Sequence, residues 1–171
     1  MPSVLVIDPG ARGEVLAYTY RKSGVDVILS KETDPQLILE TARGLKPDLV
    51  DIAQDNALDL GAVDLLQTNG FRVFGPNKNA ARIESSKVFS RRFMQRHNIP
   101  HPDFEVFDSE EAAIAYASRL YSKTPEKLIF VKADGLCAGK GALKSVTLDE
   151  AVENIRRMKS FGASGRRFLV E

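Results

Sequence analysis

Short apolar runs alternate with helical stretches through the first 75 residues, and this alternation constrains the fold more than any other feature. The apolar runs occupy residues 3–7, 25–29, 49–52 and 71–74. Between the second and third runs, Asp34 and Pro35 mark a helix start, because aspartate caps helices well and proline fits the first helical position. Strands that alternate with helices predict a parallel sheet with right-handed crossovers.

Two loops of this expected sheet are candidate ligand sites. In open parallel sheets, ligands bind at the carboxyl ends of the strands. The loops at residues 8–13 and 53–57 both follow strands and fall at that edge. Arg12, in the first loop, has two interpretations of equal weight: a ligand for a phosphate group, or a surface arginine at a helix start.

The second half of the chain has a different texture. A long polar helical region over residues 80–97 ends at the proline-containing segment 99–102, and a strand follows at 104–107. We expect a helix from Asp108 to about residue 121, with Asp108 and Glu111 as a capping box. Another capping box at residues 147–150 predicts a helix to about residue 159. Residues 167–171 are expected to form a final edge strand, which leaves the fold unfinished.

A glycine-rich loop with two lysines lies between two apolar runs, residues 127–131 and 142–146. Its glycines allow backbone N–H groups to approach an anion, and Lys132 and Lys140 add positive charge. The loop lacks the G-x-x-x-x-G-K-[ST] pattern of a Walker A motif, since a second strand follows the lysine. Strand, loop and strand together predict a hairpin that covers the phosphates of a nucleotide. The alternative is a solvated hairpin loop without a ligand.

Composition excludes several classes of protein. The 24 Lys and Arg residues nearly balance the 23 Asp and Glu residues, so bulk charge favours binding neither to nucleic acid nor to a membrane. One cysteine, Cys137, rules out an internal disulfide and a cysteine-rich metal site within one chain. The N-terminus has no basic region and only a short apolar run, so we expect a cytoplasmic protein.

Four segments together resemble one enzyme family. They are Phe74-Gly75-Pro76-Asn77-Lys78, residues 83–94 (IESSKVFSRRFM), Ile99-Pro100, and residues 131–141 (VKADGLCAGKG). In this order and at this spacing they resemble phosphoribosylamine-glycine ligase, over the whole chain. The resemblance implies an α/β chain: a Rossmann-like pre-ATP-grasp domain with linker helices over residues 1–100, then a small α+β ATP-grasp subdomain over residues 101–171. The ATP-grasp fold would be incomplete.

The resemblance also implies a reaction and its site residues. ATP would activate glycine as an acyl phosphate, which then joins the amine of 5-phosphoribosylamine, in purine biosynthesis. The residues matched to ATP are Lys87, Lys132, Asp134, Gly135, Gly139, Lys140, Gly141 and Glu171. Those matched to the substrate loops are Gly10, Arg12 and Asp55. For Lys87, which shares a helix with Arg91 and Arg92, a solvated basic face is the alternative.

The family's Mg²⁺ ligands and glycine-positioning groups would follow residue 171. We therefore assign no catalytic or metal-ligating residue to this chain and expect no product from it alone. A separate chain that supplies the remaining half would be a partner. Two other functions stay open: a non-catalytic nucleotide-binding or assembly module, and another ATP-grasp ligase or carboxylase with a different substrate.

Overall fold

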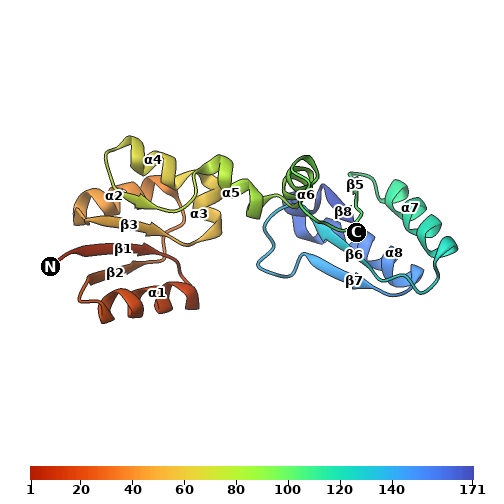
Figure 1. The fold of residues 1–171 in the computed structure, drawn as a ribbon, viewed down its shortest axis with the longest axis horizontal. Helices are drawn as coiled ribbons and strands as arrows, with labels where there is room; N and C mark the ends of the chain where they lie inside the picture. Colours follow the sequence, from red (N-terminus) through yellow and green to blue (C-terminus); the bar gives the residue numbers. More distant parts are fainter. The chain divides into compact units, whose positions relative to one another are not determined.

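The computed structural model describes residues 1–171, which form two compact units, Met1–Arg82 and Ile83–Glu171 (Figure 1). The sequence analysis placed the domain boundary near residue 100. The difference lies in helix α6 (Lys87–Arg96), which belongs to the second unit. Its first turn is bonded to Asp134, because the Val88 N–H donates to that carboxylate at 2.9 Å.

The first unit is built on a parallel sheet, as the alternation predicted. Its strands are β1 (Ser3–Ile7), β2 (Asp26–Ser30), β3 (Leu49–Ile52) and β4 (Val73–Phe74), in the order β2-β1-β3-β4. All three strand pairs are parallel. The central strand β1 is almost wholly buried, since Leu5, Val6 and Ile7 are fully inaccessible to solvent.

Helices cover both faces of this sheet (Figure 1). These helices are α1 (Ala11–Lys22), α2 (Pro35–Leu45), α3 (Asp55–Leu60) and α4 (Ala62–Thr68). Helix α5 (Lys78–Ser85) follows β4, and the boundary between the units falls within it. Ala17 of α1 packs with Val4 and Val6 on one face, while α2, α3 and α4 pack on the face that carries Leu5 and Ile7. Gly61, at φ +88°, separates α3 from α4.

The second unit has an antiparallel sheet in the order β5-β8-β6-β7. Its strands are β5 (Glu105–Phe107), β6 (Ile129–Ala133), β7 (Ala142–Ser145) and β8 (Phe168–Val170). The expectation of a final edge strand was wrong, because β8 pairs with β5 on one side and β6 on the other. Its three residues are at most 3% exposed. The sheet therefore has its last strand in an internal position.

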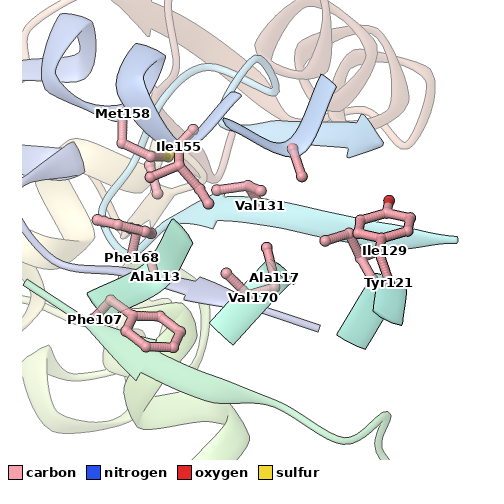
Figure 2. Close-up of a cluster of buried hydrophobic side chains, with 12 residues drawn as sticks. Phe107, Ala113, Ala117, Tyr121, Ile129, Val131, Ile155, Met158, Phe168 and Val170 are labelled. Carbon is pink, nitrogen blue, oxygen red and sulfur yellow. The ribbon is translucent and has the colours of Figure 1, made fainter. Parts of the chain in front are cut away.

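One face of this sheet packs against α7 (Glu110–Lys123) and α8 (Leu148–Arg157), which is followed by a 3-10 segment, η1 (Met158–Gly165). Figure 2 shows the resulting core, in which Ala113 and Ala117 of α7 and Ile155 of α8 gather around Val131 and Val170 of the sheet. Neither helix has the length or apolarity needed to cross a membrane, and the same holds for every other helix of the structure.

Two sequence predictions about helix ends in this half were wrong. The cap of α7 is Ser109, whose hydroxyl accepts the Ala112 N–H, and Asp108 lies before it. The single helix expected over residues 80–97 is broken at Ser86, which has extended backbone angles and caps α6 by accepting the Phe89 N–H. The cap of α8 by Thr147 is confirmed.

Candidate functional site

The glycine-rich loop is a hairpin that joins β6 to β7. The Lys140 N–H donates to the carbonyl of Cys137 at 2.9 Å and closes a four-residue turn. The two central residues, Ala138 and Gly139, have φ of 48° and 77°. Two positive φ angles in succession define a type I′ turn, whose twist suits a two-stranded hairpin. The strand–loop–strand arrangement is as the sequence predicted.

Packing explains two of the loop glycines. A Cβ on Gly135 would lie 2.9 Å from the Cα of Ser164, and a Cβ on Gly141 would lie 2.7 Å from the Cβ of Cys137. The Gly135 N–H is already bonded to the Ser164 carbonyl at 3.0 Å. By contrast, the N–H groups of residues 136–139 donate to no acceptor in the chain. The hairpin tip, with its exposed Lys140, therefore presents backbone donors that an anion could use.

The face of the sheet opposite the core carries the charged residues. Side chains alternate along β6, so Val131 faces the core while Lys132 points to the other face. Helix α6 contacts β8 on that second face. Lys87 and Arg91 are four residues apart on α6, which places them on one side of the helix. Three cations, Lys87, Arg91 and Lys132, thus gather where α6 meets the sheet.

Glu171 is the carboxylate that holds two of these cations. Arg91 donates to both of its oxygens, at 2.7 Å from Nε and 3.0 Å from Nη2, and Lys132 Nζ donates to Oε1. The Glu171 side chain is 4% exposed. Burial alone raises the pKa of this carboxyl, but the hydrogen bonds from Arg91 and Lys132 outweigh burial and hold the pKa below its ordinary value. Its main chain pairs with Phe130 at the end of β8.

Asp134 anchors the base of the loop. Its buried carboxylate accepts the Ser86 hydroxyl at 2.7 Å, the Val88 N–H at 2.9 Å and two bonds from Arg167, at 2.9 and 2.6 Å. Burial raises its pKa, and these donors together lower it to a net value below the ordinary one. Asp134 is therefore committed to bonds within the protein that tie the loop to the start of α6.

Lys87 reaches the loop from 48 residues away in sequence. Its Nζ donates to the Gly135 carbonyl at 3.1 Å, and its N–H donates to the Asp134 carbonyl at 3.0 Å. Lys87 is half-buried. The structure thus brings together the predicted residues Lys87, Lys132 and Glu171 with the loop.

Sequence reasoning missed Arg91 and Arg167 as parts of this site. The spacing of four residues from Lys87 was a usable signal for Arg91, because residues i and i+4 share a helix face. Arg167 had no such signal, since its partner Asp134 lies 33 residues earlier.

The predicted substrate residues lie together in the first unit. Gly10 and Arg12 follow β1, and Asp55 follows β3 at the same sheet edge. Arg12 donates through Nε to Asp8 at 2.8 Å and through Nη2 to Asp55 at 3.3 Å. Asp8, which was not predicted as a site residue, is 3% exposed and also accepts the Gly10 N–H at 2.6 Å. Two carboxylates therefore share one guanidinium here.

Comparison with protein families gives two adjacent matches. The N domain of phosphoribosylglycinamide synthetase matches residues 24–84, and the ATP-grasp (A) domain of the same synthetase matches residues 85–171. Together the two matches extend from residue 24 to residue 171.

Individual relatives agree. A phosphoribosylamine–glycine ligase from Escherichia coli is 34% identical over 96% of this chain and 37% of its own length. One from Pseudomonas putida is 39% identical over 72% of this chain and 28% of its own length. The chain thus spans only 28–37% of the length of these curated relatives.

Solved structures show the same fold. Phosphoribosylamine–glycine ligase from Thermotoga maritima superimposes with a TM-score of 0.69 at 24% identity, over 99% of this chain and 43% of the other. D-alanyl-alanine synthetase A from Vibrio cholerae gives 0.70 at 16% identity, over 99% and 58%. Both superpositions cover nearly the whole chain, so the likeness in fold extends over both units. By these matches, the chain belongs to the phosphoribosylglycinamide synthetase family.

Proposed function

We propose that this chain supplies the nucleotide-binding part of a phosphoribosylamine–glycine ligase, the enzyme of purine biosynthesis that uses ATP to join glycine to 5-phosphoribosylamine. One observation carries the nucleotide assignment. Lys87, Arg91 and Lys132 gather beside a glycine hairpin whose tip has free backbone donors. The names of the relatives support the choice of ligase.

The arrangement suits a triphosphate. In phosphoryl transfer, proteins contribute mainly by positioning the phosphates and by stabilising their negative charge. Lys132 and Lys87 are half-buried and held at fixed acceptors, so their positions cost little entropy when an anion binds. The hairpin tip, with Lys140, would close over the phosphates from the other side. Asp134, Gly135 and Gly141 would contribute by fixing the loop, and Gly139 by allowing its turn.

The family's Mg²⁺ has no evident binding site in this chain. No group of three or more His, Cys, Asp or Glu side chains among residues 1–171 is placed to hold a metal ion. The carboxylates nearest the lysines, Glu171 and Asp134, are already bonded to arginines. The proposal therefore assigns no step to a metal bound by these residues.

The substrate half of the proposal concerns the first unit. Gly10, Arg12 and Asp55 would line the place where 5-phosphoribosylamine binds, at the carboxyl edge of the parallel sheet. The first unit, residues 1–82, would act as the substrate domain, and the second unit, residues 83–171, which includes α6 with Lys87 and Arg91, as the nucleotide subdomain. A cytoplasmic location also belongs to this proposal.

Isothermal calorimetry tests the nucleotide assignment. ATP is titrated into the wild type and into Lys132→Met, with and without Mg²⁺. We expect at least a tenfold loss of affinity in the variant, about 1.4 kcal/mol, because the triphosphate loses a half-buried cation. Lys144→Met is the matched control, since Lys144 is an exposed lysine on neighbouring β7.

Equal affinities for the wild type and Lys132→Met would remove Lys132 from the site. An equal loss of ATP affinity in Lys144→Met would mean that the loss reflects the overall charge of the protein and not a contact made by Lys132.

A further inference from the structure

The loop after β1 has the parts of a phosphate cradle, and one of its own side chains fills it. Helix α1 begins at this loop, and helix starts present unpaired N–H groups and a partial positive charge. Gly10 allows close approach of the backbone, and Arg12 adds a guanidinium. The Gly10 N–H and the Nε of Arg12 both donate to the carboxylate of Asp8.

Each oxygen of Asp8 is engaged. Oδ1 accepts the Gly10 N–H at 2.6 Å, and Oδ2 accepts Arg12 Nε at 2.8 Å. The side chain is 5% exposed. Gly13 is packed directly against it, because a Cβ at Gly13 would lie 2.9 Å from the Asp8 Cβ. The carboxylate is thus seated where a bound anion would sit.

The charge of this edge disfavours a second anion. Asp8 and Asp55 carry two negative charges against the single positive charge of Arg12. Burial raises the pKa of Asp8, but Arg12 and the backbone donors of Gly10 and Gly13 lower it to a net value below the ordinary one. Asp8 is therefore ionised at neutral pH and repels a phosphate.

We infer that Asp8 is the specificity-determining residue of this edge: its carboxylate takes the position of a phosphate, so the edge accepts only phosphate-free parts of a ligand. The inference takes one point from the proposed function, namely that the substrate is a phosphorylated amino sugar. The phosphate of that substrate is then held outside the Asp8–Arg12–Asp55 edge.

The test is a titration of the ¹⁵N-labelled 171-residue chain with inorganic phosphate, followed through the amide signals of Gly10 and Gly13. The variants are Asp8→Gly, which removes both the charge and the bulk, and Asp8→Asn, which removes the same charge but keeps the bulk. We expect saturable shifts only in Asp8→Gly, with a Kd on the order of 1–10 mM. The wild type and Asp8→Asn should show no saturation up to about 20 mM phosphate, so their affinity for phosphate is at least several-fold weaker than that of Asp8→Gly.

Saturation in the wild type with a Kd within about threefold of Asp8→Gly would overturn the inference. A response of Asp8→Gly no stronger than that of Asp8→Asn would do the same. If Asp8→Gly does not fold, Asp8→Ser opens the position with a smaller change and takes its place in the comparison with the wild type and Asp8→Asn.

The same spectra separate this inference from the nucleotide proposal. The amide signals of residues 136–139 report on the hairpin tip in the second unit, whereas Gly10 and Gly13 belong to the first. Failure of the nucleotide proposal would leave the Gly10 and Gly13 readings unchanged.

Discussion

The two glycine-containing loops of this chain, after β1 and after β6, both lie beside carboxylates and cations, but carboxylates are in excess at the first loop and cations at the second. Each has a buried carboxylate and arginine beside a tight turn. After β1, Asp8 and Asp55 share the single guanidinium of Arg12. Beside the β6 loop, the carboxylate of Glu171, which follows β8, is shared by Arg91 and Lys132, while Asp134 at the base of the loop has its own arginine, Arg167.

This difference shows that glycines and a basic residue do not by themselves make an anion site. What matters is the charge left over after the protein's own ion pairs are formed. The β1 loop keeps a net negative charge, and the β6 loop keeps a net positive one, which Lys87 increases. Only the second has cations to offer a polyphosphate.

The largest effect we expect comes from the carboxylate that anchors the positive loop. Asp134→Ala should lower the free energy of unfolding of the second unit by about 3 kcal/mol, because it leaves the Val88 N–H and the Arg167 guanidinium without their acceptor. Urea denaturation followed by amide signals of that unit measures this. Asp55→Ala, which removes a 41%-exposed carboxylate with one bond of 3.3 Å, should cost less than about 0.5 kcal/mol.

Similar losses in the two variants would contradict the structural role given to Asp134. The base of the loop would then be held mainly by its backbone hydrogen bonds and by its packing against Ser164.

The next prediction compares the cost in stability of replacing one glycine of each loop by alanine. Gly135→Ala should cost about 2 kcal/mol, because its new Cβ meets the Ser164 backbone at 2.9 Å. Gly10→Ala should cost less than about 1 kcal/mol, because its φ of −108° suits any residue and its Cβ meets only an Asp8 oxygen, at 3.2 Å. Thermal unfolding of the two variants checks the order.

A smaller cost for Gly135→Ala than for Gly10→Ala would mean that the loop base adjusts freely. Nucleotide affinity of a folded Gly135→Ala would then show whether the loop position matters for binding.

The sequence was sufficient for the parallel sheet and for the hairpin. The strand predicted at residues 25–29 is found one residue later, and the strands at 3–7 and 49–52 are found as predicted. The central strand β1 is buried on both faces, so its apolar run is continuous and can be recognised from the local sequence. The hairpin also depends on a short stretch of chain.

Long-range pairing was beyond sequence reasoning. The internal position of β8 depends on β5, which lies more than 60 residues earlier. The break at Ser86 depends on Asp134, which accepts the Ser86 hydroxyl across 48 residues. Asp134 itself was expected to contact nucleotide, and its bonds within the protein could not be inferred from its place in a glycine-rich motif. Local patterns indicated the candidate site, whereas its ion pairs became visible only in the folded structure.

A third comparison uses the cations. Lys87→Met should weaken ATP binding about tenfold, or 1.4 kcal/mol, because Lys87 is part of the positive excess beside the hairpin. Arg12→Met should leave ATP affinity within about twofold, because its charge is already taken by two carboxylates. Calorimetry on both variants measures the difference. A tenfold loss in Arg12→Met would break the comparison, because the first unit would then contribute charge to the nucleotide site.

Low pH should destabilise the second unit more than the first, and we expect this difference to be smaller than the preceding effects. Asp134 and Glu171 have pKa values lowered despite burial, so their stabilisation is present above their ordinary values of 3.8 and 4.5 and is lost as the pH falls toward the folded-state values. In the first unit Asp8 behaves in the same way. Asp51 opposes it, because burial raises its pKa more than the Tyr20 hydrogen bond lowers it. Its folded form binds a proton more readily than its unfolded form, so protonation of Asp51 favours the folded unit.

Below about pH 4.5, amides of β6 and β8 should therefore lose protection from hydrogen exchange at a higher pH than amides of β1 and β3. Asp51→Asn sharpens this test. The neutral amide stabilises the first unit near pH 7, where the wild type holds a charge against burial, and removes the gain that the wild type obtains on protonation. The acid response of the first unit should then become steeper and approach that of the second. An unchanged response in Asp51→Asn would assign the difference between the units to residues other than Asp51.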